Sequence, residues 1–420
     1  MSGPSTATTG RPTGLGANYW KLWTASAISN LGDGIDATAL PLLAAALTRD
    51  PLLFAGVAVA ARLPWLLFAL QSGAIADRVD RRRLMAHTNL VRFALMGVLG
   101  VAVLTGWASI WLLYAVAFLL GIAETLFDNA SQAIMPALVP RDQLETANGR
   151  LFAAEIATNQ FVGPPLGGLL FAVLAALPIL LDAGTFAISA GLIFAVTGSF
   201  TTRAATEGPR QRLRRDIRVG LTWLWRHRLL RTLGLMLGLA NGMGMVVFAI
   251  FPLFALDVVG VNEVGLGLLF TAGAVGSVLG SLVAARVVAR IGRGPALIGS
   301  VVGFGAPLIV VAAWPDVLVV GAAQAVIGFA SVVWNVITVS LRQTIIPDAL
   351  LGRVNSVYRF LGWGSMPLGS LLGGVLAREF GLRTPFVIAG VVQLVALVVI
   401  LPIVNTRTIE EARRVAATDT

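Results

Sequence analysis

Acidic side chains occur inside long apolar segments of this sequence, where an ionised group is costly. Asp33 and Asp36 are three residues apart in the run LGDGID. Glu124 and Asp128 are four apart in a second apolar segment, and Glu155 lies in a third. Both spacings place the paired carboxyl groups on one face of a helix. A charge at the bilayer centre costs about 2.5–3.5 kcal/mol on insertion scales, so each acid carries a functional hypothesis.

Arginines in similar segments supply positive partners. Arg62, Arg92 and Arg359 each lie within an apolar run. Desolvation favours the neutral form of a carboxyl group, whereas a nearby arginine or a bound cation favours the ionised form. A carboxyl group that is alternately protonated and occupied by a cation can therefore exchange the two across a membrane. A static salt bridge with Arg62 or Arg92, or passive exposure to a water-filled cavity, is the alternative for each acid.

These acids are unevenly distributed along the chain. Asp182 lies near the outer half of a sixth apolar segment. Later acids, namely Asp257, Glu263 and Asp316, fall at predicted loop positions on the outer side. If protons drive a reaction in this protein, we expect its N-terminal half to carry them.

The composition excludes several classes of protein. The 420 residues are 57% hydrophobic and 12% charged, more apolar than a soluble protein of this length can hide. The absence of cysteine excludes disulfides and thiolate chemistry. Lys21 is the single lysine and does not lie in a phosphate-binding loop, which argues against ATP hydrolysis. The two histidines, His87 and His227, are too few and too separated to predict a metal site.

Long apolar runs predict an all-α polytopic membrane protein with twelve spans, because about 20 apolar residues are needed to cross a bilayer. The predicted spans are 19–47, 52–76, 84–105, 107–135, 147–176, 178–200, 231–257, 264–288, 295–313, 316–341, 353–377 and 384–405. They form an N-terminal six-helix bundle over 19–201 and a C-terminal one over 231–405. Residues 1–18 are predicted to be a disordered cytoplasmic tail, and 406–420 a second cytoplasmic tail. Residues 202–230 are a predicted cytoplasmic linker, with an amphipathic surface helix beginning at Ile217 and running to Arg231.

Basic residues concentrate in alternate loops, which predicts the orientation of the spans. One side carries the run Arg81 to Arg83, the cluster from Arg203 to Arg231, and Arg414. The other side carries little beyond Arg49, Arg378 and Arg383. This positive-inside pattern predicts a multi-pass protein of the bacterial inner membrane with both termini in the cytoplasm. Because the basic residues punctuate apolar runs, the net charge of +10 does not indicate nucleic-acid binding.

Two segments from the two halves of the chain are similar. VPRDQLETANG (Val139–Gly149) and IPDALLGRVNS (Ile346–Ser356) both carry a proline and an asparagine eight residues apart. Each precedes a segment rich in glycine and proline. A duplicated six-span unit is typical of secondary transporters, whose substrate site lies at the midplane between the halves.

The run GAIADRVDRRR (Gly73–Arg83) resembles a motif of the major facilitator superfamily that joins spans 2 and 3. Asp80 replaces the motif's second glycine. More narrowly, the sequence resembles the bacterial drug-exporter branch, which includes enterobactin- and macrolide-exporter-like proteins. The resemblance implies a major facilitator fold, alternating access and a monomer. It also implies a gating role for Asp77 and Arg78, to which we add Gly73 for close helix approach and Arg81.

The run NQFVGPPLGG (Asn159–Gly168) in span 5 matches the GPxxGG core of a signature of exporting antiporters. Gly163 and Gly167 are four residues apart and form a small face for tight helix packing, with Gly168 beside them. Pro164, together with the proline that follows it, is expected to bend or break the helix. As a block, the run favours export over uptake.

We therefore predict a secondary active transporter that exports small amphiphilic compounds, such as drugs, antibiotics or siderophore-like metabolites, by proton antiport. The predicted partners are a small-molecule substrate, protons and the lipid bilayer, without nucleic acid, cofactor or metal. An uptake symporter on the same fold is the alternative, and an anionic substrate would implicate Arg62, Arg92 and Arg359. A membrane-embedded enzyme or a receptor is disfavoured, because no catalytic constellation or soluble sensing domain is visible.

Overall fold

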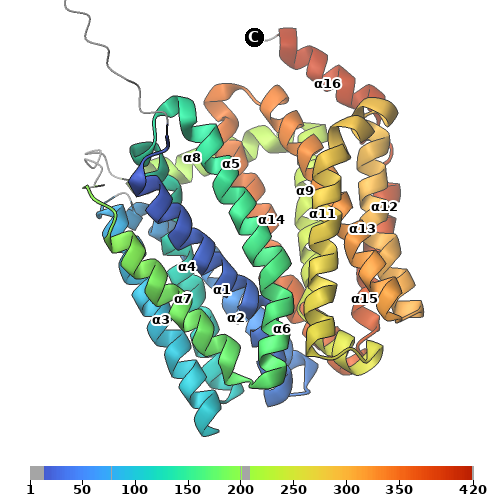
Figure 1. Cartoon of the computed structure of the whole chain (residues 1–420). Coiled ribbons are helices and arrows are strands. Elements are labelled where there is room, and N and C mark those ends of the chain that lie inside the picture. Colours follow the sequence, from blue (N-terminus) through green and yellow to red (C-terminus); the bar gives the residue numbers. More distant parts are fainter. Residues whose placement is uncertain (1–13, 77, 199, 201–208, 419–420) are drawn as a thin grey trace, which may run out of the picture.

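The computed structural model describes residues 14–76, 78–198, 200 and 209–418 (Figure 1). Within these residues the regular structure is helical throughout, without a strand. Nine of the described helices are long and apolar enough to cross a membrane. The helices follow the order of the predicted spans, so the predicted all-α polytopic fold is confirmed.

The first half of the chain has helices at all six predicted spans, and the fifth is built from three consecutive helical pieces. A short 3-10 turn, η1, precedes that fifth span. The bounds are α1 Ala17–Leu47, α2 Pro51–Ala76, α3 Arg81–Thr105, α4 Ile110–Leu138, η1 Arg141–Gln143, α5 Leu144–Glu155, the π-helix η2 Ile156–Val162, α6 Gly163–Val173 and α7 Ala176–Phe194.

The second half follows the linker helix α8 and ends in a further helix, α16. The bounds are α8 Pro209–Arg226, α9 Arg228–Phe248, α10 Phe251–Phe254, the π-helix η3 Ala255–Val259, α11 Glu263–Ile291, α12 Arg293–Ala313, α13 Val317–Ile345, α14 Asp348–Phe380, α15 Thr384–Ile400 and α16 Thr406–Thr418. The predicted C-terminal tail is thus largely helical, and most of the predicted N-terminal tail lies outside the described residues.

Two predicted helices are interrupted in the structure. The predicted span 231–257 ends as an α-helix at Phe248, and the short α10 begins at Phe251 with Pro252 in its first turn. Proline lacks an N–H and its ring clashes with the carbonyl four residues earlier, so a continuous helix cannot form here. The amphipathic helix predicted up to Arg231 stops at Arg226, because extended His227 accepts a hydrogen bond from the Leu230 N–H and caps α9.

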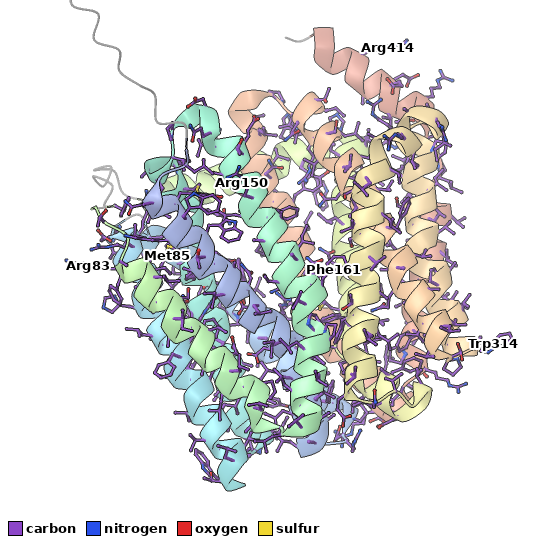
Figure 2. All side chains as sticks on the ribbon, viewed as in Figure 1. Arg83, Met85, Arg150, Phe161, Trp314 and Arg414 are labelled. Atoms are coloured by element: carbon purple, nitrogen blue, oxygen red, sulfur yellow. The ribbon has the colours of Figure 1, made fainter. Side chains whose placement is uncertain are left out.

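Both described chain ends lie at one end of the bundle, which we call the terminal face; the other end is the opposite face. In Figure 1 α5 and α6 diverge from α11 toward the terminal face and converge with it toward the opposite face. Figure 2 shows Arg83, Arg150 and Arg414 toward the terminal face, whereas Trp314 lies toward the opposite face. The arginine-rich loops therefore share an end of the molecule with the described chain ends.

Contacts between the halves close the opposite face. Arg49 Nη1 lies 2.6 Å from Asp257 Oδ1, and Arg378 Nη1 lies 3.6 Å from an oxygen of Asp50. Backbone contact adds to these ion pairs, because a Cβ on Gly168 of α6 would lie 2.2 Å from the Glu263 carbonyl oxygen. The halves are thus joined by charge and by close helix packing at this end.

Candidate functional site: an acidic cavity between the two halves

A cavity of about 1080 Å³ lies between the two halves. Its lining reaches from Phe54 and Pro252, toward the closed opposite face, to Asn148 and Phe152 of α5 near the terminal face. This volume suits a drug-sized molecule, since small-molecule sites commonly occupy about 300–1000 Å³. The lining therefore extends toward the terminal face, whereas the ion pairs between the halves lie at the opposite one.

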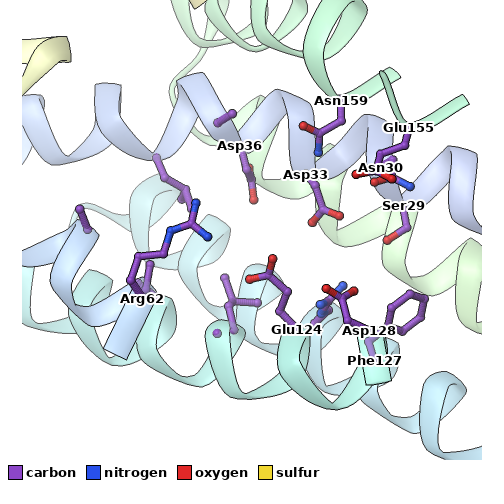
Figure 3. A pocket seen from close by; sticks show the side chains of 18 of the residues that line it. Ser29, Asn30, Asp33, Asp36, Arg62, Glu124, Phe127, Asp128, Glu155 and Asn159 are labelled. Carbon is purple, nitrogen blue, oxygen red and sulfur yellow. The ribbon is translucent and has the colours of Figure 1, made fainter. Parts of the chain in front are cut away.

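All five acids singled out in the sequence line this cavity, namely Asp33, Asp36, Glu124, Asp128 and Glu155. Figure 3 shows the α1 carboxyl groups of Asp33 and Asp36 pointing toward those of Glu124 and Asp128 on α4. The helical spacing explains the two pairs, because residues three or four apart share one face. Packing of α1 beside α4 then brings both faces to the same space.

The three predicted arginines have different surroundings. Arg62 lines the same cavity, and Figure 3 shows its side chain together with the acids. Arg92 is 4% exposed, and its guanidinium carbon lies 5.1 and 5.2 Å from the ring centres of Phe127 and Phe186. Arg359 lines a separate cavity of about 600 Å³ in the second half, so it does not join the acids.

Aromatic rings thus hold Arg92 at the edge of the acidic cavity. Among residues 14–76, 78–198 and 209–418, no ion pair joins Arg92 or Arg62 to a cavity acid. The static salt bridges considered for these acids are therefore not formed in this conformation. The carboxyl groups are left available for another cation.

Glu124 has a link to the second half that the sequence did not reveal. Trp65 Nε1 donates a hydrogen bond of 3.5 Å to Glu124 Oε2. The Trp65 ring also packs edge-on against Trp363 of α14, with ring centres 4.9 Å apart. A change in the relative position of the halves would therefore move Trp65 and alter its hydrogen bond to Glu124.

The proline pair in the fifth span produces a π-helix instead of a simple bend. Pro164 and Pro165 cannot donate backbone hydrogen bonds, and the preceding residues form η2, in which the Gly163 N–H bonds the Thr158 carbonyl. Asn159, within η2, lines the cavity beside Asp33 (Figure 3). The local break thus helps to present a polar side chain to the acids.

Gly163 and Gly167 both pack against α1. A Cβ on Gly163 would lie 2.5 Å from the Gly34 Cα, and a Cβ on Gly167 would lie 2.3 Å from the Ile35 carbonyl oxygen. Any larger residue would push the fifth span away from the helix that carries Asp33 and Asp36. Gly168, by contrast, faces the other half at the opposite face.

The motif between the second and third spans gives a mixed result. Asp77 lies outside the described residues. Gly73 has room for a side chain, because its Cβ would lie 3.7 Å from Asn129 Oδ1, so the predicted close approach is not formed here. Arg78 is exposed, and Arg81 Nη1 donates to the Ala133 carbonyl at 2.8 Å. The gating role of these residues stays a prediction.

Asp80, which replaces the motif's glycine, has a structural role. Its Oδ1 accepts the Arg83 N–H at 3.0 Å and caps α3, while Oδ2 accepts the Phe200 N–H at 3.1 Å. Partial burial opposes ionisation of Asp80, but these two hydrogen bonds and the charges of Arg82 and Arg83 outweigh it and lower its pKa. Asp80 therefore connects the start of the third span to the end of the sixth.

Asp182 is an acid that the sequence placed in a span without assigning it to the site. It is fully buried on α7, and its Oδ1 accepts a hydrogen bond of 2.9 Å from Thr185 Oγ1. Its Oδ2 has no hydrogen-bond partner among the described residues, and neither has Oδ1 of Asp36, which lies on α1 one helical turn after the Gly32 that Asp182 packs against. The apolar context of Asp182 was the available signal, but the direction in which it faces depends on helix packing.

Comparison with known proteins supports a transport family. The profile of a family described as transmembrane secretion effector matches residues 16–419. The multidrug efflux pump Tap of Mycolicibacterium fortuitum is 28% identical over 86% of this chain and 90% of its own length. Macrolide efflux protein A of Streptococcus pyogenes is 22% identical over 92% of this chain and 97% of its own.

Solved structures of transporters share the fold at low sequence identity. A bacterial homologue of the iron transporter ferroportin, in an inward-facing state, superposes with a TM-score of 0.73 at 17% identity, covering 91% of this chain and 98% of that one. The nucleoside transporter NupG superposes with a TM-score of 0.70 at 12% identity, covering 92% and 99%. These similarities concern the fold alone.

Proposed function

Because this chain belongs to the transmembrane secretion effector family of the major facilitator superfamily, we propose that it exports small amphiphilic cations in exchange for protons. The observation that carries the proposal is the acidic cavity. Five carboxyl groups line it, and the buried guanidinium beside them is held by aromatic rings instead of by an acid. The curated relatives named as efflux pumps support the direction of transport.

The lining of the cavity favours a cation with an apolar body. Carboxyl groups outnumber the arginines on the first-half wall, so a cation gains more from this site than an anion does. The second half contributes Met245, Phe248 and Phe270, which offer an adaptable apolar surface. A substrate can place its charge near the carboxyl groups of α1 and α4 and its apolar part against the side chains of α9 and α11.

Orientation follows from the arginines. The terminal face carries the basic loops, so the positive-inside rule makes it the cytoplasmic face of a bacterial inner membrane. The cavity then receives substrate from the cytoplasm. For release on the other side, the ion pair between Arg49 and Asp257 must break while the terminal face closes. Gly73, Asp77, Arg78 and Arg81 are the candidates to stabilise that closed face, in a protein that works as a monomer.

Everted membrane vesicles test this proposal. Respiration acidifies their lumen, and an antiporter lets protons leave the lumen as an added cation enters. We expect lipophilic cations such as tetraphenylphosphonium to dissipate the pH gradient, and matched lipophilic anions to have no such effect through the protein. The Asp33→Asn/Asp36→Asn double variant should abolish the response. If no cation, macrolide or catechol siderophore moves protons in vesicles that contain the wild-type chain, proton-coupled export is wrong.

A further inference from the structure

Asp36 and Asp182 form a pair of buried carboxyl groups between α1 and α7. Asp36 is 8% exposed and Asp182 is completely buried. Asp36 Oδ1 and Asp182 Oδ2 have no hydrogen-bond partner in the part of the chain that the structure describes. A hydrogen bond between the two carboxyl groups would satisfy both oxygens.

Such a bond needs a proton. Ionised carboxylates only accept hydrogen bonds, so a bond between two of them requires that one carries an O–H. Two ionised carboxylates buried side by side would also repel each other without solvent to screen them. One proton shared between Asp36 and Asp182 would remove this repulsion and satisfy both oxygens, and it would then belong to the pair.

The position of Asp182 is built into the packing of the two helices. A Cβ on Gly32 would lie only 1.8 Å from Asp182 Oδ1 and 2.3 Å from Thr185 Oγ1. Gly32 lies one helical turn before Asp36, so the groove left by the missing side chain receives the carboxyl group beside its partner. Thr185 donates to the same carboxyl group and orients it.

The pair has one member at the cavity and one behind it. Asp36 lines the cavity, whereas Asp182 is not among its lining residues. The other charged groups that act on the pair are Asp33 on α1 and Arg92 on α3. Glu124 and Asp128 on α4 lie within the electrostatic reach of Asp33. A proton that leaves the pair can thus reach cavity water through Asp36.

We propose that Asp36 and Asp182 are the proton-carrying site of this protein, and that Asp33, Glu124 and Asp128 are a separate subsite for the substrate cation. The inference rests on the proposed function. A cation that enters the subsite repels the shared proton, the O–H bond breaks, and the proton passes to water in the cavity. Departure of the cation on the other side restores the conditions for one proton to return. Each cation is then exchanged for the proton of the pair.

Proton release by purified protein tests whether the proton site and the cation subsite are separate. Tetraphenylphosphonium is added to detergent-solubilised protein in weakly buffered solution that contains a pH indicator. The wild type should release a proton for each cation bound. Asp182→Asn should still bind the cation with an affinity changed by less than about tenfold, or 1.4 kcal/mol, but release no proton. Asp33→Asn should weaken cation binding while each bound cation still expels a proton. Proton release by Asp182→Asn that equals the wild type would overturn the proposal.

Infrared spectroscopy of the same protein separates this inference from the proposed function, because it needs no substrate. At neutral pH the wild type should show the carbonyl stretch of a protonated carboxyl group. One component of this band should be lost at the same frequency in both Asp36→Asn and Asp182→Asn, and that component should be retained in Asp33→Asn and Glu124→Gln. Asparagine keeps the size of Asp182 and its acceptor for Thr185, and the Asp36 variant gives a second test if Asp182→Asn does not fold.

The two measurements fail in different ways. A component of the wild-type band that disappears in both pair variants, in a protein that transports no cation, would retain the proton pair and refute export. Proton-coupled cation export with a band that survives unchanged in both pair variants would retain the proposed function and refute the pair.

Discussion

Gly32 and Asp182 show, at the scale of single residues, how a missing side chain determines the state of a buried acid. Without Gly32 the Asp182 carboxyl group could not reach the backbone of α1, and Asp36 would lose its buried partner. The chemistry of Asp36 thus depends on a residue that has no side chain and no charge. The packing of α1 against α7 is therefore part of the proton site.

Gly32→Ala should separate the carboxyl pair. Overpacking a filled position costs about 1–3 kcal/mol, which exceeds the roughly 1 kcal/mol that alanine gains over glycine in a helix. We expect a lower melting temperature and a loss of cation-induced proton release of at least about tenfold. Gly184→Ala on α7 is the matched control, because a Cβ there meets nothing within 4 Å, and it should leave both quantities unchanged or raise the melting temperature. Equal behaviour of the two variants would contradict the assignment.

Asp80 should stabilise the folded protein in a pH-dependent way. Its pKa is lowered in the folded protein, so its stabilisation is complete above the unfolded pKa of about 3.9 and is lost as pH falls through the lower folded value. Asp80→Ala should cost about 1 kcal/mol near neutral pH through the lost helix cap. In detergent, the difference in melting temperature from the wild type should shrink below about pH 4. Asp80→Asn retains a capping oxygen and should lose far less stability. A constant difference down to pH 3 would contradict this role.

The sequence predicted those single-residue roles that depend on nearby residues, and it missed those that depend on contacts between distant segments. Asp33 and Glu124 were predicted as site residues because helical spacing and an apolar context are local properties. The role of Asp182 was not predicted, because its partner Asp36 lies far away in the sequence and their contact depends on how two helices pack. In the sequence Asp80 is only a departure from a motif, because its hydrogen bond with Phe200 is also non-local.

At the scale of the elements, the interrupted fifth span connects sequence to site most directly. Pro164 and Pro165 were expected to disturb this helix, and the disturbance is the π-helix that brings Asn159 beside Asp33. A π-helical hydrogen bond spans one residue more than an α-helical one. Conversion of η2 to an α-helix would therefore rotate the preceding residues relative to α6. The orientation of Asn159 and Glu155 thus depends on the proline pair.

Replacing both prolines should straighten this span and turn Asn159 away from the cavity. A proline inside a helix costs about 3 kcal/mol or more, so the Pro164→Ala/Pro165→Ala variant should be no less stable in heat than the wild type. We expect it to transport more slowly, by about tenfold or more.

The orientation of residue 159 can be measured by labelling Asn159→Cys with a water-soluble maleimide, because the chain has no other cysteine. The labelling should be slower in the straightened helix. Pro307→Ala in α12 is the control. Unchanged labelling and transport would refute the idea.

Most element boundaries could be predicted, because apolar runs end at polar or glycine-containing turns. The errors lie at His227 and near Pro252, where the hydropathy stays high or the amphipathic pattern continues while the backbone breaks. Hydropathy reports the solvent around a segment and does not report whether its backbone hydrogen bonds are continuous. The proline near the end of the seventh predicted span was the available signal for the second break.

At the scale of the whole molecule, the twelve spans and the repeated segments predicted two similar halves. The sequence did not predict which face of the cavity is closed, because the alternating access that we propose requires the same contacts to form and to break. The structure captures the state in which Arg49 and Asp257 join the halves at the opposite face. This state is one of at least two that the proposed transport cycle requires.

Holding the opposite face closed should stop transport. Arg49→Cys/Asp257→Cys introduces the only two thiols in the chain, at a pair whose side chains meet across the halves. A bifunctional maleimide should abolish transport in this variant, while each single variant with the same reagent stays active. Arg293→Cys/Glu410→Cys joins two elements of the second half and should transport after cross-linking. Full activity of the efficiently cross-linked Arg49→Cys/Asp257→Cys variant would show that these residues need not separate.

Obligatory exchange of a cation for a proton can be measured by following both fluxes simultaneously in proteoliposomes. Purified protein is reconstituted with an acidic lumen, and tetraphenylphosphonium is added outside. We predict that the cation accumulates while protons leave, that accumulation stops when a protonophore removes the pH gradient, and that Asp182→Asn shows neither coupled flux. Cation movement that is independent of the pH gradient, or that runs in the same direction as the protons, would rule out cation–proton exchange.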